Sequence, residues 1–467
     1  MRADWRFFVA FDEFIEIAVG LLLVLSFSQG IWQAAGIAEG IPKALIELLS
    51  VVLLVAAVWH CKKANQRFRG LVFLVPLAAA WASGAVSGWL QDSSALEQLF
   101  YLRAVLVPPI VFFALLNLPI KAVGVRRLSM LMIVLISIQA PIFAWKWYAV
   151  GVNEKFWIGT LSQTAGQLGL VFPMLVLAVI LPWYLHKGRR GLALLMLVFA
   201  FLPVINEKRG VMLAIPTILF LAVGAYFATK RGRNLIALNV NRWLLSRLSV
   251  VVLVCLTIWV GAAKLIPSLY CERFQSCHQQ TITYFFDYLT RNYASPMNAS
   301  RSSVEENTNI QLGRVELIRS SLALMSEHGA LVTLFGFGAG AVNPSPHLGV
   351  NRLDIMYDKF GLRGTYSSAL ALLYEAGMIG VLSMLGFFGL LAVEVVKRIR
   401  VAGNDDRTLA GLGVLLMISV MAFDYFLYST TGWSSCAIAP LFFTSVGIFL
   451  ARSYQECNTA LPQDRNE

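Results

Sequence analysis

Long apolar segments recur along the whole chain, and short polar connections separate them. Twelve segments come close to or exceed the about 20 residues that an α-helix needs to cross a bilayer. They are residues 14–30, 43–59, 70–90, 98–117, 128–149, 161–185, 191–205, 210–228, 247–266, 366–396, 409–430 and 434–451. The pattern predicts an all-α polytopic membrane protein with about twelve transmembrane helices.

The composition excludes a soluble globular domain. Of the 467 residues, 58% are hydrophobic and only 14% are charged, well above the apolar share of soluble domains. Arg2 and Arg6 precede the first apolar segment, as in a signal peptide, but Asp12, Glu13 and Glu16 follow them and no small-residue cleavage site stands out. We therefore expect a retained first span.

The formal net charge of +12 is arranged by loop. Alternate connections are all basic, whereas the opposite ones contain Asp92 and Glu97, or Glu154 and Lys155, and residues 267–365 balance eight basic against eight acidic side chains. The basic ones contain Lys62, Lys63, Arg67 and Arg69; Lys121, Arg126 and Arg127; Lys187, Arg189 and Arg190; Lys230, Arg231, Arg233 and Arg242; and Lys397, Arg398 and Arg400. Cytoplasmic loops carry an excess of Lys and Arg, so we expect a bacterial inner-membrane protein with both termini in the cytoplasm and read no nucleic-acid partner from the charge.

One connection, residues 267–365, is far longer than the others, and long connections are usually functional or disordered. The expected organisation is therefore transmembrane helices one to nine over residues 1–266, a periplasmic loop, helices ten to twelve over 366–452 and a cytoplasmic tail over 453–467. Residues 313–334 have helical apolar spacing, which predicts an amphipathic helix lying on the membrane. Cys271 and Cys277 share this loop and either form a disulfide or stay reduced.

Glu47, Arg103, Glu375 and Asp424 lie inside predicted spans in the half nearer the periplasm, whereas the cytoplasmic half has little beyond edge residues such as Glu16 and Glu394. A charge in the hydrocarbon costs roughly 2.5–3.5 kcal/mol on insertion scales and is a functional-site hypothesis by default. The alternative is that these groups pair and fasten helices together. A transporter needs polar groups across both halves, so the one-sided placement favours chemistry at the outer leaflet.

The connection Asn206–Gly210 is a very short external turn that opens directly into a span. Lys208 and Arg209 stand beside the free amides of the helix N-terminus, an arrangement suited to binding phosphate. The alternative is that the two cations only cap an interfacial turn.

Four short motifs in this order resemble the superfamily of O-antigen ligases and O-antigen polymerases. Residues 206–214 (NEKRGVMLA) are similar to its Ser/Lys-Arg-Gly opening of a mid-chain span, and Gly313-Arg314 is similar to a Gly-Arg pair that begins a loop helix. Residues 334–340 (LFGFGAG) resemble its Gly-x-Gly turn, and 366–380 (YSSALALLYEAGMIG) resemble its His-Asn-x-x-Leu, acidic, Gly-x-x-Gly segment. The resemblance covers about residues 160–395.

The resemblance implies a GT-C-like membrane glycosyltransferase that joins undecaprenyl-diphosphate-linked oligosaccharides without a metal or cofactor. Cations would hold the diphosphate leaving group. The expected catalytic residues are Arg209, Arg314, His347 and Glu375, with Asp354 as a further candidate base, and the expected substrate-binding residues are Arg103, Lys208, Arg352, Arg363, Tyr366 and Asp424. Membrane lipids and a chain-length regulator and flippase of the same pathway are the expected partners.

One departure separates the branches of this superfamily. Ligases have His-Asn where this chain has Tyr366-Ser367, and a ligase is thought to use that histidine at the acceptor hydroxyl. The departure favours a polymerase of O-antigen or exopolysaccharide repeats, with a ligase as the alternative. A transporter of lipid-linked sugars is the alternative from another class. The chain contains no Asp-x-Asp motif for a cytoplasmic nucleotide sugar.

Overall fold

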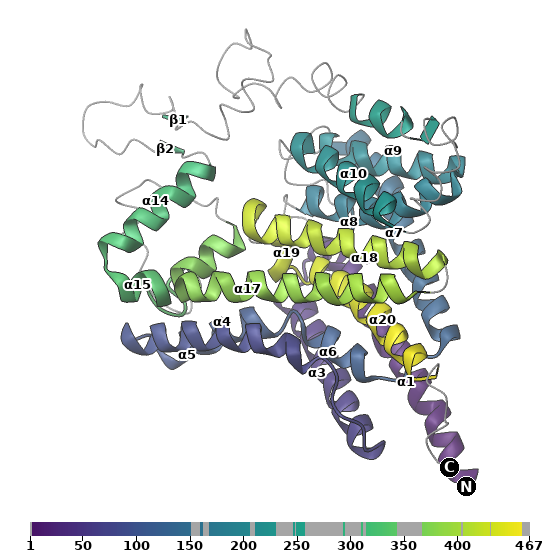
Figure 1. Cartoon of the computed structure of the whole chain (residues 1–467), viewed down its shortest axis with the longest axis horizontal. Helices are drawn as coiled ribbons and strands as arrows, with labels where there is room; N and C mark the ends of the chain where they lie inside the picture. The colour runs from purple at the N-terminus through teal and green to yellow at the C-terminus, as the bar shows by residue number, and fades with distance from the viewer. Residues whose placement is uncertain are drawn as a thin grey trace.

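The computed structural model describes residues 2–150, 159–161, 168–205, 211–229, 246–247, 249–256, 293–294, 310–311, 314–342, 367–402, 405–429 and 431–459. These residues are almost entirely helical (Figure 1). The exception is a pair of antiparallel two-residue strands, β1 (Tyr293–Ala294) and β2 (Ile310–Gln311), in the long connection. The described residues are thus those of a helical bundle, as the sequence predicts.

The helices follow the apolar segments closely. They are α1 (Arg2–Phe27), α2 (Gln29–Ala34), α3 (Gly40–Lys63), α4 (Leu71–Leu90), α5 (Ala95–Leu106), α6 (Ile110–Asn117), α7 (Ala122–Val150), α8 (Leu168–Lys187), α9 (Arg190–Ile205), α10 (Val211–Ala228), α14 (Arg314–Glu327), α15 (Ala330–Phe335), α17 (Ser368–Val401), α18 (Asp405–Phe423), the π-helical turn η3 (Asp424–Tyr428), α19 (Thr431–Ser434) and α20 (Ile438–Thr459). Residues 249–256, within the ninth predicted span, are helical too.

Six described helices are long and apolar enough to cross a bilayer: α3, α4, α7, α8, α17 and α18 with η3. The pair α5 and α6 makes a seventh if its two halves form one span. The sequence predicts a single span over residues 98–117, but the helix bends by 48° there. Pro108 and Pro109 lie at the bend, where they remove two amide donors and stop the helix. The number twelve remains a prediction.

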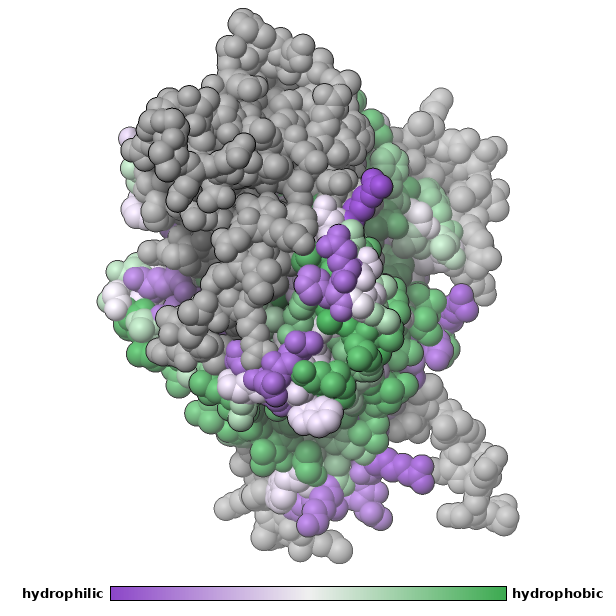
Figure 2. All heavy atoms as spheres, turned by 90° about the vertical axis from the view of Figure 1, so that its left-hand side faces the viewer, coloured by the Kyte–Doolittle hydropathy of each residue, from purple (hydrophilic) through white to green (hydrophobic). Residues whose placement is uncertain are grey.

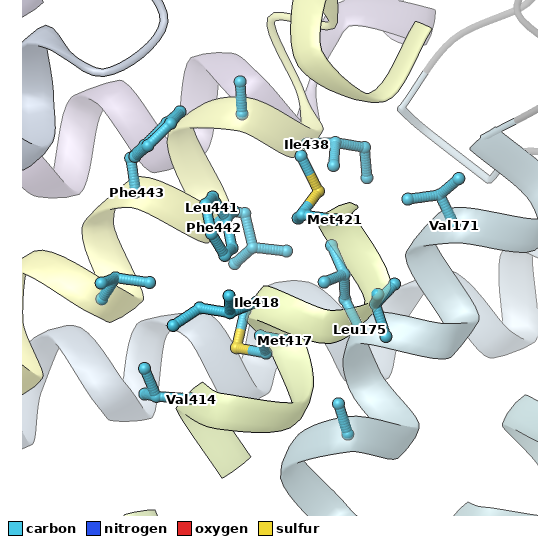
Figure 3. Close-up of a cluster of buried hydrophobic side chains, with 14 of the residues drawn as sticks. Val171, Leu175, Val414, Met417, Ile418, Met421, Ile438, Leu441, Phe442 and Phe443 are labelled. Atoms are coloured by element: carbon cyan, nitrogen blue, oxygen red, sulfur yellow. The ribbon is translucent and has the colours of Figure 1, made fainter. Parts of the chain in front are cut away.

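Large apolar side chains face outward on these helices. Ile17, Val75 and Phe220 are 69%, 67% and 74% exposed, which is costly in water and favourable against lipid. Inside the bundle, α8, α18 and α20 bury a cluster that includes Leu175, Met417 and Phe442 (Figure 3). The exposed apolar surface and the buried core together define a multi-pass membrane protein.

Ion pairs gather the basic helix ends at one end of the bundle. Lys121 lies 2.5 Å from Asp12 of α1, and this hydrogen bond raises the pKa of the lysine. Arg398 near the end of α17 pairs with Glu394 at 2.7 Å and lies over the ring of Tyr454 in α20. Arg69 contacts the same ring, so connections far apart in sequence share this end.

The opposite end holds α14, α15 and the first turns of α17, of which α15 and α17 lie beside α4 (Figure 1). Viewed from that side, the described surface is mainly apolar, and its hydrophilic side chains form small separate groups (Figure 2). Of the predicted loop 267–365, this end contains the described residues 314–342.

The expectation of one amphipathic helix over 313–334 is wrong, whereas its placement on the membrane stays a prediction. Gly329, with φ at 99°, separates two helices, α14 and α15. The buried side chains of α14 include Leu317, Leu324 and Met325, which pack against Tyr374 in α17. Helical spacing marks an apolar face but does not identify what covers it, and here another helix does.

Candidate functional site

The glycine-rich turn 336–340 is seated against a break in α17. Gly377 interrupts this helix with φ 64° and ψ −164°, a conformation open essentially only to glycine. A Cβ on Gly377 would stand 2.3 Å from the carbonyl of Leu334, and one on Gly336 would stand 2.6 Å from the carbonyl oxygen of Tyr374. Gly336 and Gly377 therefore allow the backbone of the turn and the backbone of α17 to come into direct contact.

Hydrogen bonds that link the glycine turn, α4 and α17 stabilise this contact. The amide of Phe337 donates to the carbonyl oxygen of Tyr374 at 2.6 Å. From α4, the Ser87 hydroxyl donates to the carbonyl oxygen of Gly336 at 2.8 Å, and the Ser83 hydroxyl donates to that of Ala376 at 2.7 Å. The break leaves helix carbonyls without their usual partners, and these donors satisfy them.

Glu375 lies within the break and is half-buried. Its carboxylate accepts the amide of Val342 at 3.4 Å and a backbone hydrogen bond from Gly340. Tyr101 of α5 and Tyr425 of η3 are close enough to interact electrostatically with it. The carboxylate thus reaches the residues at which the turn leads on to segment 343–366.

The other side of the turn contacts α5. A Cβ on Gly338 would come within 2.8 Å of the Ser93 hydroxyl, and one on Gly340 within 2.8 Å of the Glu97 side chain. Glu97 also belongs to the capping box that starts α5, in which it accepts the Ser94 amide at 2.6 Å. The turn is therefore enclosed by α4, α5 and α17.

Helix α14 is tied to the same place. The hydroxyl of Tyr374 in α17 donates to that of Ser321, and the two side chains are buried together. Arg314 is the first residue of α14 and thus belongs to this unit, although its side chain lies outside the described residues. Two of the four motifs that carry the family resemblance consequently adjoin, the glycine turn and the late segment, and the loop helix contacts the late segment at Ser321.

Arg103, expected to bind substrate, has a carboxylate partner. Its guanidinium contacts both oxygens of Glu47 in α3, with distances of 2.8, 3.0 and 3.2 Å. This pairing is the alternative considered for the intramembrane charges, a fastening between helices. Nearby, the Trp433 indole donates to the Ala104 carbonyl at 3.0 Å and holds α5 against α19.

Asp424 is completely buried at the start of η3 and accepts the Ser429 hydroxyl at 2.7 Å. Gly432 packs directly on it, since a Cβ there would lie 1.8 Å from a carboxylate oxygen. Ser367, the helix cap of α17, donates to the carbonyl of Phe426 in the same π-helical turn. The aspartate therefore has a structural environment, and its predicted contact with substrate stays a prediction.

Six expected site residues lie outside the residues that the structure describes. They are Lys208, Arg209, His347, Arg352, Arg363 and Tyr366, and the further candidate base Asp354 lies outside them too. Cys271 and Cys277 lie outside them as well, whereas Cys61, Cys255 and Cys436 are free thiols.

Three polar residues at this end of the bundle were missed from the sequence. Ser83 and Ser87 look like ordinary small residues of a span, and their four-residue spacing on one helix face is the only signal. Lys146 near the end of α7 is a further charge within a predicted span, and its ammonium donates to the Gly159 carbonyl at 2.6 Å. A lysine between two tryptophans could have drawn attention to it.

The described residues contain no group of three His, Cys, Asp or Glu side chains that could hold a metal ion. Fold and site together define a multi-pass helical membrane protein with a polar, backbone-lined junction at one end. No protein-family model matches the chain. The search of curated proteins finds no match either.

Proposed function

We propose that this protein is a polysaccharide polymerase of the bacterial inner membrane. It joins undecaprenyl-diphosphate-linked oligosaccharide repeats at the periplasmic face into an O-antigen or exopolysaccharide. The acceptor hydroxyl attacks the anomeric carbon, the new glycosidic bond forms, and the lipid diphosphate leaves with the bonding electrons. The hydroxyl proton passes to a base or to water.

One observation carries the proposal: the glycine turn 336–340 and the late segment 366–380 meet at the break in α17. Both were recognised separately as similar to motifs of one superfamily, and nothing in their spacing requires contact. The link between Ser321 and Tyr374 adds the helix that begins with Arg314. Contact between these motifs supports a shared site.

The proposed chemistry needs cations at the diphosphate, because negative charge develops on it as the sugar departs. We assign this role to Arg209 and Arg314. A guanidinium offers a planar fork to a phosphate, and Lys208 stands beside Arg209 as a further cation. Arg103 is left out, since its guanidinium already pairs with Glu47.

A transporter of lipid-linked sugars is less well supported by the charges in the described helices. Three charged side chains lie near helix ends, and these helix ends are the ones that meet the glycine turn or α19. They are Glu47, Arg103 and Glu375. Handing a glycan through the bilayer calls for polar groups in both halves. Within the enzyme class, a ligase remains the alternative. The pair Tyr366-Ser367 argues against a ligase, because ligases have His-Asn at these positions.

Deletion of the gene tests the proposal through the surface glycan. A polymerase defect leaves single repeats attached to their anchor and removes the long polymer. Retained polymer that is no longer attached would indicate a ligase instead. Absence of both single repeats and polymer at the surface, with repeats accumulating inside, would indicate transport.

A further inference from the structure

The break in α17 brings one carboxylate to two backbone amides. Glu375 belongs to α17, whereas Gly340 and Val342 belong to the end of the glycine turn. Val342 is 5% exposed and Ala339 is 1% exposed, so the turn is packed and its exit is fixed. Segment 343–366, with His347, Arg352 and Arg363, begins directly after this point.

We propose that Glu375 is a positioning residue that clamps the glycine turn onto the break in α17, and that Ser83 and Ser87 of α4 complete this clamp. The carboxylate holds the turn at its exit, and the two serine hydroxyls hold the backbones on either side of the contact. The clamp fixes Val342, after which the sequence continues into the segment with the candidate glycan-binding residues.

The contacts of Glu375 favour this role over that of a general base. A base must reach the proton of an acceptor hydroxyl, within about 2.6–3.2 Å or through one water. This carboxylate instead faces amides of the chain's own backbone. The titratable groups around it are Tyr101 on α5, Tyr425 on η3, Tyr374 on α17 and Glu97 beside Gly340.

Thiol accessibility tests the clamp without any assay of activity. An Ala339→Cys variant places a thiol in the buried turn, and a membrane-impermeant maleimide measures its exposure. We expect slow labelling in the otherwise unchanged chain and labelling at least tenfold faster when Glu375→Ala is added. Glu375→Gln retains an acceptor oxygen at the same reach and should keep labelling within about threefold of the slow rate.

Two controls accompany this experiment. Glu394→Ala removes a carboxylate from the other end of α17, where it pairs with Arg398, and should leave the labelling slow. The chain without the introduced cysteine gives the background from native thiols. If Glu375→Ala prevents folding, Ser87→Ala replaces it as the milder opening of the clamp. Labelling that stays slow in the folded opening variant overturns the clamp.

The catalytic consequence rests on the proposed function and has its own measurement. With lipid-linked repeats as substrate, Glu375→Gln should keep polymerisation within about tenfold of the native rate with the same pH profile, and Glu375→Ala should lose more. A general base would make both variants lose about 10²–10⁴-fold and would remove the acid limb of the profile. That result overturns the positioning role. A native protein without polymerase activity would refute the proposed function while the labelling result still stood.

Discussion

At the scale of single residues, Arg103 and Glu47 show how a charge pair can be retained in an apolar bundle. The fork of the guanidinium meets both carboxylate oxygens, so neither charge is left uncompensated. The side chains are only 39% and 23% exposed. At such a partly buried pair, removing one charge should lower the stability of the protein more than removing both charges.

We predict this order for the stability of variants in detergent. Arg103→Ala and Glu47→Ala should each lower the free energy of unfolding by about 1–2 kcal/mol, less than for a fully buried pair because Arg103 remains partly exposed. The double variant should be no less stable than the worse single one, as thermal unfolding would reveal. Strictly additive losses would show that the pair does not act as a fastening.

The two arginines assigned to the diphosphate lead to a different prediction. Arg209→Ala and Arg314→Ala should each reduce polymerisation by about 10²–10³-fold while the protein still inserts and folds, because a contact made in the transition state is lost. Lysine at either position should rescue only in part, since an ammonium has no planar fork. Loss of the variants from the membrane fraction would instead make these arginines structural.

At the scale of elements, the glycine at the break of α17 is the most sensitive position. Gly377→Ala would place a methyl group 2.3 Å from the backbone of Leu334 at a φ of 64°. Overpacking and backbone strain together should cost roughly 2–5 kcal/mol, seen as a lower midpoint of thermal unfolding. Gly389→Ala in the same helix meets nothing within 4 Å and should be neutral or stabilising. Equal midpoints for the two variants would contradict the seated turn.

Some of these elements can be predicted from the sequence and others cannot, depending on whether apolar length or a specific neighbour determines them. Apolar length alone locates α3 and α4 within a few residues, because burial in lipid needs little beyond length. The break at Gly377 was not predicted, since a glycine in an apolar span usually only weakens the helix. The partner of α14 was not predicted either, because spacing reveals a face but no neighbour.

Only part of the candidate site could be predicted, because spacing and residue type do not show which segments are neighbours in the fold. The motifs singled out the glycine turn and the segment of Glu375, and these two segments meet. Ser83 and Ser87 escaped notice because they pair with backbone carbonyls, one at the break in α17 and one in the glycine turn. Contacts to backbone depend on the fold and leave little trace in residue type.

At the scale of the whole molecule, the two ends of the bundle differ. One end collects basic residues with their ion pairs, and the other holds the glycine turn, Glu375 and the Arg103 pair. The positive-inside rule assigns the basic end to the cytoplasm. Alkaline phosphatase fused after Ser300 should therefore be active, and a cytoplasmic reporter at the same site inactive. The reverse result would invert the orientation and move the site to the wrong face.

Reconstitution tests the central claim most directly. The purified protein in vesicles, given an undecaprenyl-diphosphate-linked repeat and no nucleotide sugar, should form a ladder of products differing by one repeat. It should release one undecaprenyl diphosphate for each bond formed, and the doubly substituted Arg209→Ala, Arg314→Ala protein should form no ladder. Movement of the unchanged repeat across the vesicle membrane, with no bond formed, would contradict the account.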